Sequence, residues 1–370
     1  MTLLFDAHHL GRRQSGNEVW TRNIVRAMQP LLADGEMEYA VSDAGLDELR
    51  CLTGATTHLV HGSSLRRLAF DLPRIARARS VSAMFAAYTA PLTRRPIVLQ
   101  VHDVAAWHRD AGTWLPLATR LQYRATVGSS ARLAHHVVTL SGATQRDLIE
   151  KLGVRPERVS IAGAAVDFDL ANVLASTPRR ENAPAFRVLA VGNVLPRKNL
   201  TLLARAVRAC RDSGADMQLR IVGSVPKAGR QIAEGIRNLL GPAVHLTGYV
   251  ELEQLAIEYM SADALGFPSL LEGFGIPVTE AMTAGVPVVV SNTSSLPEVV
   301  GDAALIRAAG DVAGWRDALM RLYDEPALRE ELRQRGLRQA SRFSWHDSAK
   351  VVVDRLRVAA GASSDALDPG

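Results

Sequence analysis

Short apolar runs alternate with amphipathic stretches along most of the chain. In the first half, apolar runs of four or five residues predict β-strands, and the stretches between them, with apolar residues at helical spacing, predict α-helices. The expected strands are 2–5, 39–42, 97–101 and 136–140, and the expected helices are 18–28, 120–134 and 143–151. This alternation is typical of a parallel sheet whose strands are connected by crossover helices.

The same alternation starts again after a polar, proline-containing stretch at 175–185, which we interpret as a linker. The expected strands are 187–191, 218–222, 244–247, 264–267 and 286–290, and the expected helices are 200–212, 231–240, 252–260 and 278–284. A chain of 370 residues favours two domains, each with its own core. We therefore predict two α/β domains at 1–174 and 186–344, a last helix at 345–360 capped by Ser344, and a disordered tail at 361–370.

The composition is that of a globular protein, with 47% apolar and 22% charged residues. No apolar run approaches the roughly 18 residues of a membrane-spanning helix, and no charged prelude of a signal peptide precedes the first strand. Only Cys51 and Cys210 are present, without the spacing of a metal site, which suits a reducing compartment. We expect a cytoplasmic protein.

The formal net charge of +5 permits contact with an anionic membrane or an anionic substrate. Arginines are densest in segment 65–79, where they alternate with apolar residues as on an amphipathic surface helix. Either a solvated helix face or a peripheral membrane contact fits this pattern. The solvated face is favoured, because membrane-surface helices are the rarer of the two in globular enzymes.

The most informative motif carries Glu272 and Glu280, eight residues apart, around a Gly-Phe-Gly-Ile-Pro turn. Pro277 suits the first turn of a helix, whose N-terminus presents unpaired amides to an anion. The amides of Phe274, Gly275, Ile276 and Val278 are the candidate donors, and Gly275 lacks a Cβ that would keep a ligand away. Because ionised carboxylates accept hydrogen bonds from hydroxyls, the motif predicts a ligand with a central anion and hydroxyls on both sides, such as a nucleotide sugar.

A second candidate is the cation pair Arg197 and Lys198, which follows the strand expected at 187–191. Two adjacent cations at the end of a buried strand suit a diphosphate, the arginine as a bidentate donor and the lysine as a point charge. No Asp-x-Asp motif for magnesium is visible, so we predict a metal-independent site without a cofactor.

The sequence Leu271-Glu-Gly-Phe-Gly-Ile-Pro-Val-Thr-Glu280-Ala-Met-x-Ala-Gly-Val-Pro resembles the signature of the retaining glycosyltransferases of family 4. Further matching segments come in the order of that family: 196–199, 245–250 and 294–299. The resemblance covers most of 186–343 well and the first half more loosely. It implies a GT-B fold, in which two Rossmann-like, doubly wound parallel-sheet domains face an interdomain cleft. It also implies donor binding in the C-terminal half, acceptor selection in the N-terminal half, and a last helix that packs back on the first domain.

The resemblance also suggests individual roles. Glu280 would hold the ribose hydroxyls, and Glu272 would lie against the transferred sugar, near the positive charge that develops at its anomeric carbon. In the first half, Gly16 and Asn17 stand in a loop that approaches the donor phosphates in the family, with Asn17 where a second glycine is common. His102, at the end of the strand 97–101, would act near the donor sugar; a histidine satisfied in the core is the alternative.

We therefore expect a retaining glycosyltransferase that moves a hexose, with mannose favoured, from a nucleotide diphosphate sugar to a hydroxyl acceptor. GDP-mannose is the leading donor and a UDP-hexose the next. The acceptor would be a sugar, glycolipid or small molecule, in the synthesis of a surface polysaccharide or glycolipid, and no nucleic-acid partner is expected. The alternatives are a sugar-nucleotide epimerase or phosphorylase of the same fold, and a catalytically silent nucleotide-sugar-binding protein. Motifs of other chemistries, such as a P-loop, a zinc-protease helix or a nucleophile elbow, are absent from the sequence.

Overall fold

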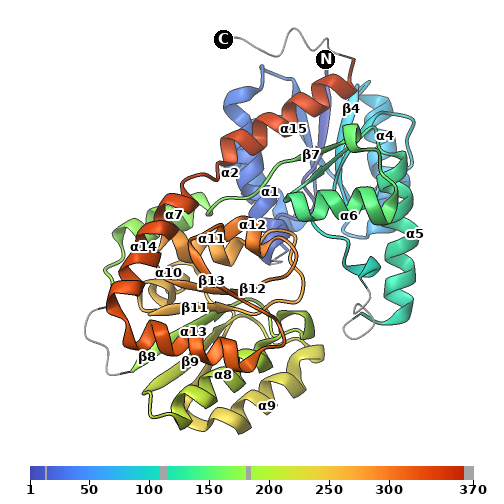
Figure 1. The fold of residues 1–370 in the computed structure, drawn as a ribbon. Helices are drawn as coiled ribbons and strands as arrows, with labels where there is room; N and C mark the ends of the chain where they lie inside the picture. Colours follow the sequence, from blue (N-terminus) through green and yellow to red (C-terminus); the bar gives the residue numbers. More distant parts are fainter. Residues whose placement is uncertain (13–14, 109–114, 181–184, 362–370) are drawn as a thin grey trace. The chain divides into compact units, whose positions relative to one another are not determined.

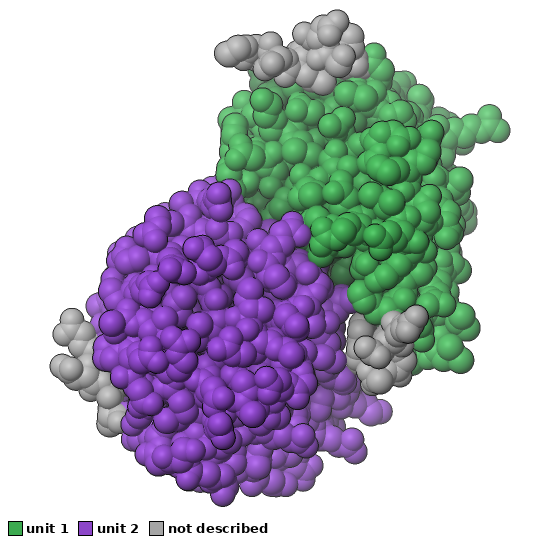
Figure 2. Space-filling view, viewed as in Figure 1, with its two compact units in different colours: residues 1–164, 344–370 green, residues 165–343 purple. Residues whose placement is uncertain are grey.

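The computed structural model describes residues 1–12, 15–108, 115–180 and 185–361. They divide into two compact units, which are coloured separately in Figure 2. Unit 1 comprises residues 1–164 together with the C-terminal segment from Ser344, and unit 2 comprises 165–343. Each unit contains one parallel sheet with helices around it (Figure 1).

Unit 1 is built on a seven-stranded parallel sheet with the order β3-β2-β1-β4-β5-β6-β7. Its strands are β1 (Leu3–Asp6), β2 (Met37–Val41), β3 (Thr57–Leu59), β4 (Ala83–Ala87), β5 (Ile97–Gln100), β6 (His136–Thr139) and β7 (Val159–Ile161). The helices are α1 (Ser15–Met28), α2 (Leu46–Leu52), α3 (Ser64–Arg66), α4 (Leu72–Ala78), α5 (Leu117–Leu133), α6 (Gly142–Leu152) and α15 (Trp345–Ala359). A π-helical turn at Arg67–Asp71 joins α3 to α4.

The central strands of unit 1 are buried on both faces, as expected for a parallel sheet covered by helices. All residues of β1 are buried, and the ring of Phe5 stacks on that of Phe85 with centroids 4.4 Å apart. The last helix, α15, packs against α1, β4 and β5 of this unit. The Ser344 side chain accepts a hydrogen bond from the Asp347 amide, which confirms its prediction as the helix cap.

Unit 2 is built on a six-stranded parallel sheet with the order β10-β9-β8-β11-β12-β13. Its strands are β8 (Phe186–Val191), β9 (Met217–Val222), β10 (Val244–Gly248), β11 (Ala264–Phe267), β12 (Val288–Ser291) and β13 (Ala304–Arg307). The helices are α7 (Phe168–Ser176), α8 (Leu200–Asp212), α9 (Arg230–Leu240), α10 (Leu252–Met260), α11 (Ile276–Thr283), α12 (Leu296–Val300), α13 (Val312–Asp324) and α14 (Pro326–Ala340). Helix α8 packs between α9 and α13, and Trp315 of α13 is fully buried in this core.

Both sheets have the doubly wound strand order, in which the chain moves to one side and then continues on the other. The order reverses beside β1 and β4 in unit 1 and beside β8 and β11 in unit 2. In open α/β sheets, ligands bind beyond the carboxyl ends of the strands at such a switch point. The loops after these strands are therefore where each unit is expected to bind a ligand.

The fold confirms the predicted class of two parallel-sheet α/β domains, and it adds elements that the hydrophobic pattern did not predict. The strands β3, β4, β7 and β13 were not expected, because three are short or half-buried edge strands and β4 is largely alanine. Helices α2, α7, α12, α13 and α14 were also not assigned from the sequence.

The division between the units falls between Ala164 and Ala165, about ten residues before the predicted one. The reason is that α7 packs on α10 of unit 2. Within the predicted linker, Arg179 donates hydrogen bonds to the carbonyls of Ala284 and Gly285, so this part is anchored on unit 2. Residues 181–184 of that linker and 362–370 of the predicted tail lie outside the described residues.

Within the described part of the chain, no helix combines the length and the apolar character needed to cross a membrane.

Two glycines of unit 2 provide a test of this packing. A Cβ on the buried Gly229, just before α9, would lie 1.8 Å from the carbonyl oxygen of Val194, whereas a Cβ on Gly235 within α9 would meet nothing within 4 Å. We expect Gly229→Ala to lower the free energy of unfolding by about 1–3 kcal/mol or more through steric overlap. Gly235→Ala should raise it by about 0.5–1 kcal/mol through helix propensity. Urea unfolding of both variants checks this, and an equal effect of the two substitutions would contradict the packing around Gly229.

Candidate functional site

The predicted donor site of unit 2 lies at the switch point of its sheet. Pro196–Lys198 form a short 3-10 turn in the loop after β8, and Glu272 stands in the loop after β11. The two loops are joined by a backbone hydrogen bond of 2.8 Å from the Leu270 amide to the Arg197 carbonyl. The structure thus brings Arg197 and Lys198 together with Glu272, which lies more than seventy residues further along the sequence.

Glu272 and the cation pair form one buried ion cluster. The Lys198 Nζ donates to Glu272 Oε1 at 2.6 Å, and Arg197 Nη1 lies 3.3 Å from Oε2. Lys198 and Glu272 are each only 9% exposed, and the ammonium also lies 4.7 Å from the centre of the Phe267 ring. The sequence predicted a loop carboxylate at 272 and, separately, a cation pair that binds a diphosphate. In the structure, Glu272 forms ion pairs with both cations.

The protonation state of Glu272 follows from this cluster. Burial alone would raise the pKa of its carboxyl, but the charges of Lys198 and then Arg197 outweigh burial and lower the pKa to about 2. Glu272 is therefore a fixed negative charge throughout the ordinary pH range. Two cations and one carboxylate leave the cluster with a net positive charge, which favours an anionic ligand.

Two serines hold the Glu272 loop in place. Ser294 Oγ accepts a hydrogen bond from the Glu272 amide at 2.8 Å, with Ser294 itself at a φ of +48°. The fully buried Ser295 hydroxyl lies 3.0 Å from the Glu272 carbonyl and 2.9 Å from that of Phe274. The roles of these two hydroxyls are not predictable from segment 294–299 alone, since they contact backbone atoms of another loop.

The Gly-Phe-Gly turn leads into α11, as predicted. Gly275 has a φ of +108°, which an L-residue rarely adopts, and a Cβ there would come within 2.9 Å of the Leu296 side chain. Among the described residues, the amides of Phe274, Gly275 and Ile276 have no hydrogen-bond acceptor. The Val278 amide, in contrast, donates to the Gly275 carbonyl at 2.8 Å, so the expectation of an unpaired amide is wrong at that position. Three amides at the helix N-terminus remain for a ligand.

Glu280 lies within α11 and has an environment opposite to that of Glu272. Its carboxyl is 6% exposed and accepts a hydrogen bond of 2.6 Å from the Tyr259 hydroxyl. Burial raises its pKa to about 7, the hydrogen bond from Tyr259 opposes the rise, and the charge of Asp167 adds to it. Neither Tyr259 nor Asp167 was singled out in the sequence, because both come from elements distant along the chain.

In unit 1, His102 lies two residues after the carboxyl end of β5. Its ring lies between those of Trp20 and Tyr88, with centroid distances of 5.7 and 5.6 Å. Burial lowers its pKa to about 3, so the imidazole is neutral at working pH. Its Nε2 has no hydrogen-bond partner among the described residues. This buried, unsatisfied nitrogen suits a ligand-facing histidine better than one satisfied in the core.

Gly16 and Asn17 lie in the first turn of α1, where Gly16 is exposed and a Cβ on it would meet nothing within 4 Å. The neighbouring Glu18 is buried and accepts a hydrogen bond from the Gly11 amide at 3.1 Å. The Glu18 carboxylate thus has a structural partner in its own loop. Residues 13–14 of this loop lie outside the described residues.

A buried polar cluster at the carboxyl end of β1 was not predicted from the sequence. Asp6 Oδ2 lies 3.1 Å from His8 Nδ1 and 3.2 Å from Arg67 Nε, and the rings of His8 and His9 are 3.9 Å apart. Several of these buried atoms, including both ring nitrogens of His9, lack a hydrogen-bond partner in the described residues. The cluster lies at the switch point of the sheet, which marks it as a candidate binding site. The switch point can be located only once the strand order is known.

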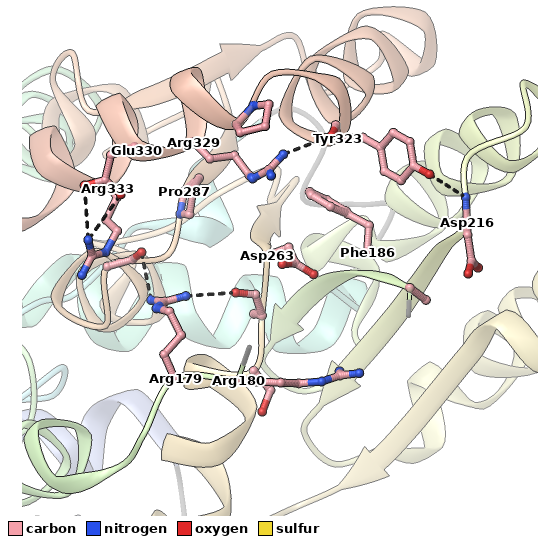
Figure 3. A pocket seen from close by; sticks show the side chains of 15 residues that line it. Arg179, Arg180, Phe186, Asp216, Asp263, Pro287, Tyr323, Arg329, Glu330 and Arg333 are labelled. Atoms are coloured by element: carbon pink, nitrogen blue, oxygen red, sulfur yellow. Dashed lines mark hydrogen bonds and ion pairs between the residues drawn. The ribbon is translucent and has the colours of Figure 1, made fainter. Parts of the chain in front are cut away.

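No group of three or more histidine, cysteine or acidic side chains in the described residues is arranged to hold a metal ion. A separate hollow of about 580 Å³ in unit 2 lies by the amino ends of the strands, next to Phe186, Asp263 and Pro287 (Figure 3). Its arginines are accompanied by Asp216, Asp263 and Glu330, and Arg179 is fixed by backbone carbonyls. It lies away from Glu272 and Glu280, which follow the carboxyl ends of the strands.

The profile of the family "Glycosyl transferases group 1" matches residues 177–339, and that of "Glycosyltransferase Family 4" matches residues 47–170. Among solved structures, HepE of Anabaena in complex with UDP-glucose superposes with a TM-score of 0.76 at 17% identity, over 97% of this chain and all of that one. This likeness supports the fold.

Two curated relatives are similar in sequence. One is the MMP alpha-(1->4)-mannosyltransferase of Mycolicibacterium hassiacum, with 30% identity over 70% of this chain and 64% of the relative. The other is the D-inositol 3-phosphate glycosyltransferase of Rhodococcus opacus, with 26% identity over 71% of this chain and 62% of the relative. The alignments thus span slightly less than two thirds of these relatives. Together with the two family profiles and the doubly wound sheets, they show that the chain belongs to glycosyltransferase family 4, a family of transferases with the GT-B fold.

Proposed function

We propose that the protein is a retaining hexosyltransferase that takes a sugar, with mannose favoured, from a nucleotide diphosphate donor and transfers it to a hydroxyl acceptor. The observation that carries this proposal is the buried cluster of Glu272, Lys198 and Arg197, next to the N-terminus of α11 and its unpaired amides. A net positive charge, a helix N-terminus and a fixed carboxylate in one place suit a diphosphate with a sugar attached.

In this proposal, Lys198 and Arg197 bind the diphosphate together with the amides of Phe274, Gly275 and Ile276. Charge-assisted hydrogen bonds and the positive end of the helix both favour the negative charge that grows on the leaving phosphate. They provide the electrostatic stabilisation that a metal ion supplies in other transferases, and we therefore propose that no metal or cofactor is needed.

Glu280 would accept hydrogen bonds from the ribose hydroxyls. An ionised carboxylate can accept hydrogen bonds from two neighbouring hydroxyls at once. A protonated carboxyl accepts fewer hydrogen bonds, because one of its oxygens carries the proton. The hydrogen bond from Tyr259 to Oε2 already orients the carboxyl. Because the pKa of Glu280 is raised to about 7, binding of the ribose should favour loss of its proton.

Glu272 would stabilise the positive charge that develops at the anomeric carbon as its bond to the phosphate oxygen breaks. The acceptor oxygen forms the new bond on the same face, its proton passes to the departing phosphate oxygen, and the nucleoside diphosphate leaves. This sequence retains the anomeric configuration. The neutral imidazole of His102 is proposed to donate a hydrogen bond to a sugar hydroxyl.

The named relatives support the choice of donor. The Mycolicibacterium relative is named as a mannosyltransferase, and the HepE structure contains UDP-glucose. We propose GDP-mannose first and a UDP-hexose second, with a sugar, glycolipid or small molecule as acceptor and a place in the synthesis of a surface polysaccharide or glycolipid.

The first test is Glu272→Gln, which keeps the shape of the side chain but removes its charge. We expect turnover of the donor, measured as release of nucleoside diphosphate, to fall by about 10²- to 10³-fold, the range for loss of one transition-state stabiliser. Calorimetry should still detect binding of the nucleoside diphosphate, because Lys198 and Arg197 remain.

The matched control is Glu234→Gln, on the exposed face of α9, which should leave turnover unchanged. Unchanged turnover in Glu272→Gln would refute the catalytic role of Glu272. Binding without turnover in the wild-type protein would favour the silent binding protein, and isomerisation of the donor sugar without acceptor would favour the epimerase.

The second test is the pH dependence of donor affinity. The ionised form of Glu280 binds better, so affinity should rise as the pH increases through about 7 and level off above it. We expect binding of GDP-mannose to be about three- to tenfold weaker at about pH 6 than at about pH 8. A nucleotide sugar is the suitable probe, because its diphosphate is esterified at both ends and does not titrate in this range.

Glu280→Gln serves as the control, since it keeps an acceptor for Tyr259 but cannot ionise. Its affinity should be lower and independent of pH. If calorimetry finds the same pH profile in wild type and Glu280→Gln, Glu280 is not the group that holds the ribose.

A further inference from the structure

Unit 1 contains a large open hollow of about 1600 Å³ that the proposed transfer reaction does not use. Ile97 and His136, the first residues of β5 and β6, line it, so it lies by the amino ends of these strands. His102 stands beyond the opposite end of β5. The hollow is also lined by α4, the β4–β5 loop, α5 and α15.

The hollow is strongly basic. Six arginines and two histidines are among the described residues that line it, and Glu157 is the only carboxylate among them. The arginines are Arg77, Arg94, Arg95, Arg155, Arg158 and Arg355. Glu157 lies 3.4 Å from Arg155, so it offsets only one of these charges.

The arginines are not neutralised by other neighbours. Arg77, Arg94 and Arg95 are exposed, and their side chains make no ion pair or hydrogen bond with any described residue. The Nε of Arg355 is buried and has no partner in the described residues. The whole chain has a net charge of only +5, so this hollow is a local concentration of positive charge.

Apolar side chains are exposed in the same hollow. Leu92 in the β4–β5 loop is 74% exposed, and Leu133 at the end of α5 is 82% exposed. The amide of Leu92 donates to the carbonyl of Leu68 at 2.9 Å, which ties this loop to the π-helical turn before α4. Outside the lining of the hollow, Leu65 of α3 and Phe70 of the π-helical turn are also exposed, at 77% and 68%.

We propose that this hollow and its rim dock on the surface of an anionic phospholipid bilayer. The arginines would attract the lipid phosphates, and the leucines would enter the boundary between headgroups and acyl chains. A soluble polyanion would also attract the arginines, but it would leave Leu92 and Leu133 in water. The exposed leucines beside unpaired arginines therefore favour a bilayer.

The structure changes the interpretation of segment 65–79, for which the sequence favoured a solvated helix face. The segment is helical from Ser64 to Ala78, but the π-helical turn interrupts its α-helical spacing, and its residues Arg67, Leu72 and Ala76 are buried. The apolar and basic residues of the hollow come instead from α4, the β4–β5 loop, α5, residues 155–158 and α15. The sequence pattern of one helix cannot reveal a surface that several segments form together.

The test is flotation of the full chain with lipid vesicles. The wild-type protein should bind vesicles of phosphatidylcholine with about one third phosphatidylglycerol, and not vesicles of phosphatidylcholine alone. Arg94→Glu with Arg95→Glu should weaken binding by about tenfold or more, because two attractive charges become repulsive. Leu92→Ser with Leu133→Ser should weaken it by roughly fivefold.

Two variants of unit 2 are matched controls. Arg230→Glu with Arg237→Glu makes the same charge change at exposed positions of α9, and Ile257→Ser removes an exposed apolar side chain. Both should bind vesicles like the wild type. Three results would each overturn the proposal. The control variants could lose vesicle binding as much as the docking-surface variants, or the wild type could bind neutral vesicles as well as anionic ones. The leucine variant could also keep full vesicle binding while heparin displaces the protein from the vesicles. Donor turnover measured without lipid is independent of the docking surface, so failure of the transferase proposal would be recognised separately.

Discussion

A buried ion pair between Lys198 and Glu272 organises the candidate site. Each charge would be costly to bury alone, and the Lys198 ammonium, 2.6 Å from the Glu272 carboxylate, keeps that carboxylate ionised. The pair joins the loop after β8 to the loop after β11, the two strands at which the order of the sheet reverses. The approach to α11 follows directly from the Glu272 loop, so the position of the helix N-terminus depends on the same contact.

The two glutamates of the motif show that environment, rather than residue type, sets electrostatic behaviour. Both are almost fully buried, and burial disfavours ionisation in each case. Glu272 has two cations beside it, and its pKa falls to about 2. Glu280 accepts a hydrogen bond from the Tyr259 hydroxyl and feels the negative charge of Asp167, and burial raises its pKa to about 7. One carboxyl is therefore a permanent charge, while the other responds to pH and to a ligand that donates hydrogen bonds.

The two ends of the strands in the sheet of unit 1 lie near surfaces of different chemical character. Beyond the carboxyl ends lie His102 and the cluster of Asp6, His8, His9 and Arg67, whose buried polar atoms lack part of their hydrogen bonds. By the amino ends lies the basic hollow with its exposed leucines. Polar groups without partners in a buried environment favour a small polar ligand, whereas an open basic and apolar surface favours an extended one.

Much of this could be derived from the amino-acid sequence. The alternation of apolar runs and helices indicated two parallel-sheet domains, and the spacing of Glu272 and Glu280 around a glycine-rich turn indicated a helix N-terminus with two carboxylates. These features are local, because hydrophobic period, turn residues and capping act over a few neighbouring positions. Edge strands and the alanine-rich β4 escaped the same reasoning, since their local pattern is weak.

The tertiary structure decided the rest. In the folded chain, Glu272 forms ion pairs with Lys198 and Arg197. Tyr259 and Asp167 influence the pKa of Glu280. The Val278 amide donates a hydrogen bond to the Gly275 carbonyl in the same turn. The tertiary structure also collected arginines and leucines from several segments into one hollow. These contacts join residues far apart along the chain, and a carboxyl's pKa depends on burial and on charges a few ångströms away. Neither distance nor burial exists in a linear sequence, so only the folded chain could determine them.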